Sequence, residues 1–271
     1  MKQENFNYLK EQVKFSGFGD AMEFKLKEKM IEGLTDFQLH HKHTFGKDNV
    51  EAVLNFRKSD QDNYFFNSYQ VTVNKEGADP LKQLYKLYKP DKLVKQVEGK
   101  DDTVEWVNHN IKLKEAYNLL EGRSVRKEYV RDETEKYANW LMIDFKNTDK
   151  DGNFLIKRKM DFDLEAKLKE YPIKELKNEE SKKELLDSLY KGNRQFVTMD
   201  IDGKERKFAF EANAQFSSVN RYEGDTRIKS GEKATPDQSA KQNESQKADQ
   251  AEDKPRQSKR NAQKNKRGIT S

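Results

Sequence analysis

The chain has 271 residues, of which 33% are hydrophobic and 37% are charged. Globular domains of average composition are closer to half apolar and one quarter charged, so we expect small, thin-cored units and a disordered region rather than one large core. Cysteine is absent from the sequence, which excludes disulfide scaffolds, thiol nucleophiles and thiolate zinc sites.

The N-terminus and the apolar runs of the sequence bear on localisation. The first ten residues, MKQENFNYLK, lack the apolar stretch of an export signal. No apolar run approaches the roughly 20 residues that a membrane-spanning helix needs. We therefore expect a cytoplasmic protein with no membrane contact.

The net charge of +5 is concentrated at one end of the chain. Residues 224–271 contain 12 Lys or Arg and 7 Asp or Glu, which leaves 41 of the 53 basic and 41 of the 48 acidic residues in the preceding body. The body is therefore balanced in charge, and any argument from basicity concerns the C-terminal tail alone.

An internal repeat organises the body. Residues 30–62 match residues 119–151 without a gap when the sequence is shifted by 89 positions, so that Glu32-Gly33 falls on Glu121-Gly122. Each copy predicts a helix that ends at glycine, two strand-like segments, and an acidic turn after the second strand. We interpret the match as a duplication. A chance likeness of two ordinary hairpins is the alternative.

Local patterns along the chain favour the same elements. Residues 50–57 alternate apolar and polar side chains, as a half-buried strand does. Residues 113–120 carry apolar side chains at helical spacing, and Asp151-Gly152 after the next strand predicts a hairpin. Another helix is predicted before Gly192, and Asp202-Gly203 predicts a last hairpin. The fold class that follows is α+β, with two related helix-plus-antiparallel-sheet units in tandem and a disordered tail.

These elements divide the chain into three parts. Residues 1–100 form the first repeat unit, residues 101–222 the second, and residues 223–271 a tail with no aromatic residue. Residues 74–100 fit the repeat poorly, because helically spaced apolar residues there stop at Pro90. This segment is predicted to be either an inserted helix or a linker between the copies. The composition of the tail cannot offset the entropy of ordering a chain, which predicts disorder.

Five short segments in the second half of the body follow the order found in a known bacterial family. They are LKEAYNLLEGRSV (113–125), IDFKN (143–147), YPIKEL (171–176), KGNRQFVT (191–198) and EANAQF (211–216). Over residues 110–222 the chain resembles the uncharacterised family called domain of unknown function 3945, which is common in Bacteroidetes and often encoded near mobile elements. Ala214 departs from the proline of the family pattern. The resemblance implies a genomic neighbourhood and supplies no catalytic residue.

Two patterns resemble metal sites, and each has a plainer interpretation. Residues 147–152 match the start of a calcium loop, but the twelfth position holds Arg158 in place of the bidentate glutamate, so a polar hairpin turn is favoured. His41 and His43 would share one face of a strand, with no carboxylate at a metal-binding spacing. We predict no metal, no cofactor and no catalytic residue, because the acidic pairs lie in turn-rich stretches. The chain is therefore not expected to be an enzyme.

Aromatic residues are numerous in both copies, with Tyr64, Phe65, Phe66 and Tyr69 in the first. A stacking surface for single-stranded nucleic acid is one interpretation. Core packing is favoured, because a body poor in aliphatic side chains needs large rings to bury area. In the second copy, Trp140 points away from its apolar neighbours, either as an exposed anchor or beneath a helix.

The tail carries the strongest functional signal. Residues 254–267 contain seven basic residues and no acidic one. Such an arm binds phosphates by counterion release without reading sequence, and the alternative is a tail that only solubilises. We predict a non-catalytic accessory protein of a mobile element that associates non-specifically with DNA or RNA, or alternatively a protein–protein interaction module. The predicted nucleic-acid-binding residues are Lys254, Arg256, Lys259, Arg260, Lys264, Lys266 and Arg267.

Overall fold

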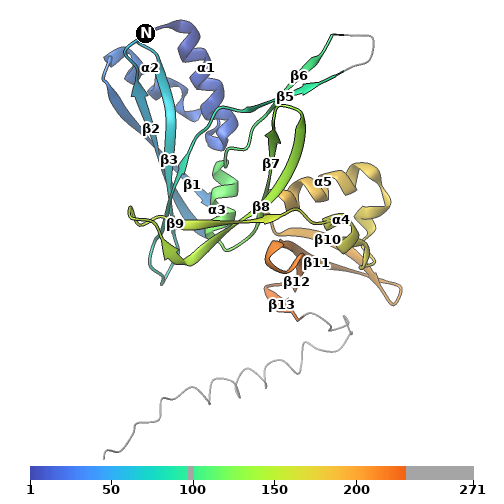
Figure 1. Cartoon of the computed structure of the whole chain (residues 1–271). Coiled ribbons are helices and arrows are strands. Elements are labelled where there is room, and N and C mark those ends of the chain that lie inside the picture. The colour runs from blue at the N-terminus through green and yellow to red at the C-terminus, as the bar shows by residue number, and fades with distance from the viewer. Residues whose placement is uncertain (97–100, 230–271) are drawn as a thin grey trace, which may run out of the picture. The chain divides into compact units, whose positions relative to one another are not determined.

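The protein is built from helices and antiparallel sheets, so the predicted α+β class is confirmed (Figure 1). The computed structural model describes residues 1–96 and 101–229. Its strands form four sheets, and within each sheet the strands follow one another in sequence order. The predicted disorder of the tail and its basic cluster lie outside the described residues.

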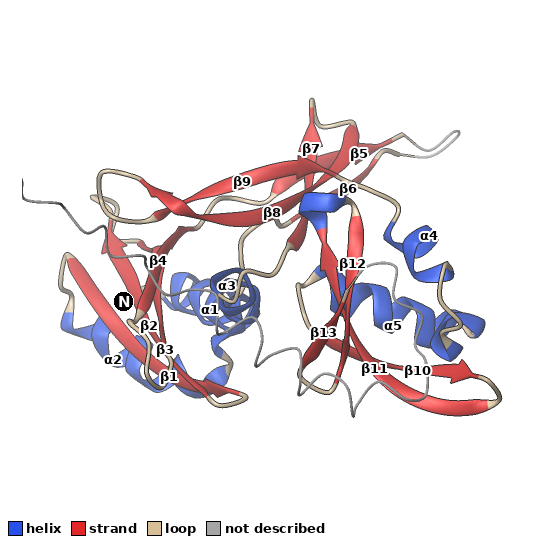
Figure 2. Ribbon diagram, turned by 90° about the horizontal axis from the view of Figure 1, so that it is seen from below, coloured by secondary structure: helices blue, strands red, loops and turns tan. Residues whose placement is uncertain are grey.

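The first unit is a pair of helices on one face of a four-stranded sheet (Figure 2). The helices are α1 (Gln3–Val13) and α2 (Glu23–Glu32), joined by the short turns η1 (Lys14–Phe18) and η2 (Asp20–Met22). The sheet contains β1 (Asp36–Phe45), β2 (Asp48–Lys58), β3 (Tyr64–Asn74) and β4 (Leu81–Lys86) in this order. Alternate residues of β2, from Val50 to Phe56, are buried, as their period of two predicts.

Residues 74–96, the described part of the segment 74–100, contain the strands β4 and β5 (Asp91–Lys95), so the helix or linker predicted there is wrong. β4 pairs with β3 along its whole length. The apolar residues of this segment fit a helical period as well, but strand alternation buries Gln83 and Tyr85 on the same face and extends the sheet. β5 then pairs with β6 (Thr103–Val107) in a two-stranded ribbon. This ribbon crosses the unit boundary that was predicted at residue 100.

The second unit repeats the order of the first. The predicted helix is α3 (Leu113–Leu120), and the strands β7 (Val125–Arg131), β8 (Glu135–Thr148) and β9 (Phe154–Met160) form a meander. Both units pass from helix to sheet through a glycine in the left-handed region, with φ of 76° at Gly33 and at Gly122. A residue with a Cβ is strained at this angle, which explains why glycine ends both helices.

The hairpins of the two units end in the same turn, at Ser59–Asn63 and at Asp149–Asn153. In both turns the N–H of the first residue donates to the carbonyl of the fifth at 2.8 Å, and the N–H of the fourth donates to the carbonyl of the first at 3.0 and 3.1 Å. These turns lie 90 positions apart, so the predicted gapless match at 89 is wrong at its end. The extra residue is accommodated by an irregular register in β8 between Asp144 and Thr148.

A third helix-and-meander unit completes the body. α4 (Leu164–Lys169) and the turn η3 (Lys174–Lys177) lead into α5 (Glu179–Tyr190), which ends before Gly192 with φ of 76°. β10 (Gln195–Ile201), β11 (Lys204–Asn213), η4 (Ala214–Phe216), β12 (Ser218–Glu223) and β13 (Thr226–Ile228) follow. β13 pairs with β12, so the folded body reaches beyond residue 222, where the tail was predicted to begin.

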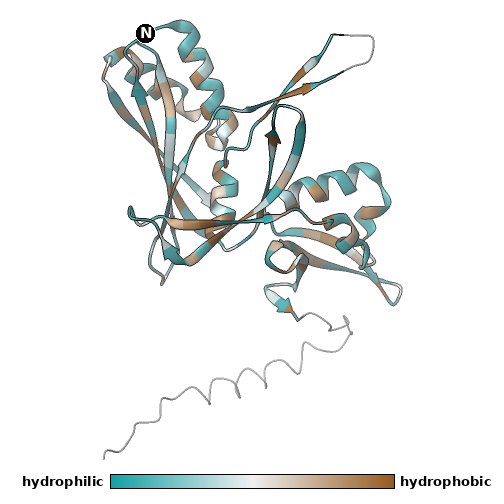
Figure 3. Ribbon diagram, in the orientation of Figure 1, coloured by the Kyte–Doolittle hydropathy of each residue, from teal (hydrophilic) through white to brown (hydrophobic). Residues whose placement is uncertain are grey.

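The first two units share one hydrophobic core. Leu113 and Leu119 of α3 belong to the same buried cluster as Leu54 of β2 and Val71 of β3. In Figure 3, α3 carries more hydrophobic colour than α1, α2 or α5, in agreement with its seven buried residues. A helix that is buried on most sides needs such a composition, because sheets lie on both sides of it. The two copies are therefore one body and not two independent beads.

Candidate nucleic-acid interface

The seven basic residues predicted to bind nucleic acid, Lys254, Arg256, Lys259, Arg260, Lys264, Lys266 and Arg267, lie outside the described residues. The other predicted sites lie within them. His41 and His43 share the inward-facing side of β1, with ring centroids 6.1 Å apart. His41 packs edge-on against Phe18 at 5.5 Å, and burial lowers the pKa of His41. Among the residues that the structure describes, no group of three or more His, Asp or Glu is placed to hold a metal ion.

The segment that resembles a calcium loop is a hairpin turn between strands. Asp149 Oδ1 accepts hydrogen bonds at 2.9 Å from the backbone N–H groups of Asp151 and Asn153. These bonds, the one from Asn153 above all, lower the pKa of the Asp149 carboxyl. The carboxylate therefore closes the turn by local bonding, as aspartate does in many turns.

The aromatic residues that were considered for stacking mostly form the core. Tyr64, Phe66 and Tyr69 are buried, and of the four residues in the first copy only Phe65 is exposed. Trp140 is fully buried, with its ring 5.3 Å from Phe162 and facing α5. Trp140 therefore packs beneath a helix, and the exposed-anchor alternative is wrong.

A row of aromatic rings crosses the second sheet and the loops beside it. We call this set the tyrosine row, and it consists of Tyr88, His109, Tyr129 and Tyr137. Successive ring centroids are separated by 5.8, 5.2 and 5.5 Å, and the last two pairs are stacked with interplanar angles of 29° and 25°. Such offset stacks are a favourable arrangement for aromatic side chains.

Four segments bring the tyrosine row together. Tyr129 and Tyr137 are direct partners in the pairing of β7 with β8. Tyr88 lies in the loop before β5, and the side-chain amide of Asn110, in the loop after β6, holds its backbone in place. The Tyr88 N–H donates to Asn110 Oδ1, and Asn110 Nδ2 donates to the Tyr88 carbonyl, both at 2.8 Å. Asp91 accepts a bond from the N–H of Val130 at 3.1 Å and lies 3.3 Å from His109 Nδ1. The row therefore rests on strands and on a pinned loop.

Two arginines flank the tyrosine row. The Arg131 guanidinium lies 5.1 Å from the centre of the Tyr137 ring, and that of Arg158 lies 5.6 Å from the centre of Tyr129. Arg131 is also 3.3 Å from Glu135, whereas Arg158 makes no ion pair with any other described residue. Burial is the main reason why the pKa of Tyr129 is raised. The row thus combines partly desolvated rings with one cation that has no carboxylate partner within the described chain.

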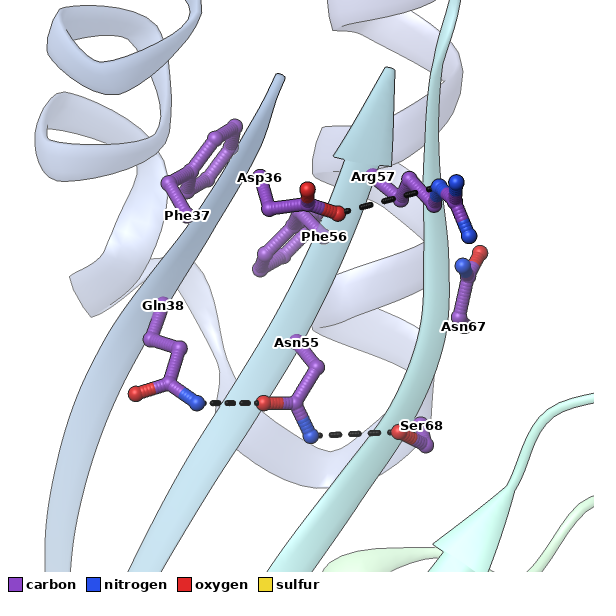
Figure 4. Close-up of a pocket in the computed structure, with 8 residues that line it drawn as sticks. All are labelled: Asp36, Phe37, Gln38, Asn55, Phe56, Arg57, Asn67 and Ser68. Atoms are coloured by element: carbon purple, nitrogen blue, oxygen red, sulfur yellow. Dashed lines mark hydrogen bonds and ion pairs between the residues drawn. The ribbon is translucent and has the colours of Figure 1, made fainter. Parts of the chain in front are cut away.

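The open face of the first sheet contains a depression of about 550 Å³ (Figure 4). Gln38 donates to Asn55 at 2.8 Å, and Asn55 donates to Ser68 at 3.1 Å. Arg57 lies 3.8 Å from Asp36 at one end of the depression. These polar groups satisfy one another across the strands, so they leave few free donors or acceptors for a ligand.

The segments that carry the family resemblance meet at the joint between the second and third units. Asn118 is fully buried and donates to Lys191 O at 2.7 Å and to Asn193 Oδ1 at 2.8 Å. Arg123 donates to Asn118 Oδ1 at 2.6 Å, and it lies 3.9 Å from Glu211. The segments 113–125, 191–198 and 211–216 therefore converge in one buried polar network, whose role is to seat one unit on the other.

No family model, curated protein or solved structure matches the chain in our comparisons, so the resemblance to domain of unknown function 3945 stays a prediction. Within the described part of the chain, no helix has the length and apolar character to cross a membrane. The tyrosine row was not predicted from the sequence. Its only sequence signal is the placement of Tyr129 and Tyr137 on either side of a short turn, whereas Tyr88 and His109 join them through loops.

Proposed function

We propose that the protein is a non-catalytic accessory protein that associates with nucleic acid and that its basic tail supplies the phosphate contacts. The observation that carries this proposal is the segregation of charge. Residues 254–267 contain seven basic residues without an acidic one, whereas the body before residue 224 has equal numbers of both signs. Nucleic acids are bound non-specifically by such acid-free basic segments. The association with a mobile element rests on the family resemblance alone.

The ion pairs of the body support the assignment of phosphate contacts to the tail. Lys136, for example, lies 2.9 Å from Glu105 and 3.3 Å from Glu128, and Lys95 lies 2.5 Å from Glu105. Exposed pairs of this kind add little stability, but they reduce the positive potential that a polyanion meets. Within residues 254–267 no acidic residue is interspersed among the seven basic ones, although Glu252 and Asp253 directly precede Lys254.

The test compares the full-length chain with a full-length variant in which glutamine replaces all seven basic tail residues. Substitution is preferable to truncation after Tyr222, which would remove β13 and the end of β12. For a labelled DNA duplex, seven phosphate contacts predict a slope of log K against log salt of about −6, or a loss of affinity of about 4 × 10³-fold between 50 and 200 mM salt. The glutamine variant should lose both the affinity and the slope.

A matched control exchanges lysine and arginine within the tail and keeps all seven charges. This control should bind as the wild type does, because counterion release depends on charge and not on the basic side chain that carries it. Unchanged affinity and salt slope in the glutamine variant would refute the proposal, as would a wild-type chain that binds no duplex at low salt.

A protein–protein interaction module is the second candidate, and the β5–β6 ribbon favours it. Trp106 and Val104 of β6 are 64% and 49% exposed. Tryptophan is enriched among the residues that carry most of the binding energy of protein interfaces. If this surface binds a protein, a partner should remain bound at high salt to the glutamine variant of the tail and be lost from Trp106→Ala. The opposite pattern would assign the interaction to the tail.

A further inference from the structure

The tyrosine row keeps part of its aromatic surface open to solvent. The Tyr88 side chain is 57% exposed, and Tyr129 and Tyr137 are half-buried. The hydroxyls of these three tyrosines make no hydrogen bond within the described chain, and none of them is among the buried polar atoms that lack a partner. The hydroxyl ends of the rings must therefore reach water. A cluster that served only as core would bury these groups against a protein acceptor.

The chemistry of the row matches exposed bases joined by phosphates. Bases stack on tyrosine and histidine rings regardless of sequence, because every base has an aromatic face. Arg158 has no carboxylate partner among the described residues, and Arg131 has only an exposed one, so both can contact phosphate or stack. In a duplex the base faces are covered by their neighbours, whereas a single strand exposes them. Within the row the rings of His109, Tyr129 and Tyr137 stack on one another, so a base would stack on the end of the row at Tyr88, whose side chain is exposed.

We propose that the tyrosine row is a base-stacking site for single-stranded nucleic acid, with Arg158 and Arg131 as its phosphate contacts. This inference rests on the proposed association with nucleic acid and adds a second site to it. The tail binds duplex and single strand alike through charge, and the row adds affinity only for the single strand. The two contributions also differ in salt dependence, since stacking releases no counterion and only two arginines of the row contact phosphate, against seven basic residues in the tail.

The test measures fluorescence anisotropy of the full-length chain with a labelled oligothymidine and with a duplex of the same length. The variants are Tyr88→Ala and Arg158→Gln, which change side chains on the surface and keep the Tyr88 backbone bonds to Asn110. Loss of one stacked base weakens binding of a single strand by about 5- to 150-fold. We expect a loss in this range for Tyr88→Ala with single-stranded DNA and unchanged binding of the duplex. Tyr88→Trp, which keeps an aromatic ring at this position, should bind single-stranded DNA as the wild type does.

The control variant is Phe65→Ala, which removes an aromatic side chain that is 48% exposed on the first sheet. It should leave both affinities unchanged, because Phe65 lies outside the row. Equal loss of single strand and duplex in Tyr88→Ala, or no loss in either row variant, would overturn the stacking site and leave the row as packing between loops and sheet.

The failures of the two proposals are distinguishable. If only the row is wrong, the glutamine tail variant loses both nucleic acids and the row variants lose neither. If only the tail is wrong, the glutamine variant still binds oligothymidine, with a weak salt dependence, and Tyr88→Ala does not. A wild-type chain that binds neither nucleic acid refutes both proposals.

Discussion

The most informative perturbation of the fold concerns an ion pair inside the second unit. Lys127 Nζ of β7 lies 2.6 Å from Glu115 Oε2 in the first turn of α3, and both side chains are only 7% exposed. The same carboxylate oxygen accepts the N–H of Lys112 at 2.8 Å and so caps the helix. The pair therefore joins α3 to the sheet in a region that largely excludes water.

Replacement of one partner should cost more than replacement of both. In Lys127→Met the Glu115 carboxylate stays buried without its cation, and removal of one partner of a buried pair typically costs about 3–5 kcal/mol. Glu115→Gln should cost less, because burial already lowers the pKa of Lys127 and the lysine can lose its proton. The glutamine also retains a helix-capping side chain. The double variant removes both charges and should lie within about 2 kcal/mol of the wild type.

The assay is urea unfolding of all four proteins, followed by far-ultraviolet circular dichroism. These four free energies of unfolding form a double-mutant cycle, which should give a coupling energy between Lys127 and Glu115 of about 2–3 kcal/mol, large for a pair of side chains. A lysine whose pKa is lowered in the folded state binds fewer protons there than in the unfolded chain, so the stability of Glu115→Gln should rise with pH towards the ordinary lysine pKa. Additive single effects, or a cost below about 1 kcal/mol for Lys127→Met, would refute the assignment of a buried pair.

Three further predictions follow from the described geometry. Gly192→Ala should cost about 2–5 kcal/mol in urea unfolding, because its Cβ would lie 2.8 Å from a backbone carbonyl, whereas Gly203→Ala, with the same left-handed φ and open space around it, should cost about 1–2 kcal/mol. Hydrogen bonds, chiefly from Lys157, lower the pKa of Asp144 to about 2, so Asp144→Asn should remove part of the stability that the wild type loses as the pH falls from about 4 to 2, and an NMR titration midpoint near 4 would contradict this. Trp106→Phe should remove the accessible one of the two tryptophans, and acrylamide should then quench the remaining fluorescence weakly.

The parts of the fold that were predicted correctly are those with strong local signals. The helix over residues 113–120 has its apolar residues on a helical period, and the hairpin at Asp202-Gly203 has both residues at positive φ, as its sequence predicts. Both features depend on neighbours in the chain. Such signals survive folding because the tertiary structure does not have to override them.

The errors arose where two periods fit the same residues. Residues 81–88 allow apolar contacts at helical spacing and also on alternate positions. Only the presence of β3 beside them decides for a strand, and this contact lies outside the segment. The third unit was missed for a related reason: its helix, its glycine and its first hairpin were each predicted, but comparison at one fixed offset of 89 positions could not relate Gly192 to Gly122.

The candidate site was less predictable than the fold, since its rings come from two strands and two loops. Tyr88 reaches the row because Asn110 pins its backbone, and His109 reaches it because β5 and β6 fold back as a ribbon. No spacing in the sequence encodes either contact. The aromatic cluster that the sequence made conspicuous, by contrast, was composed of core residues.

This division between core and surface also limits what the family resemblance can mean. Asn118, Arg123 and Glu211 of the matching segments are largely buried, and they hold the third unit against the second. None of the four rings of the tyrosine row, nor Arg158, lies in a matching segment. Residues that seat one unit on another are constrained by packing, whereas surface residues vary without loss of the fold. The predicted resemblance therefore concerns residues of the scaffold, and it gives no reason to expect a shared ligand.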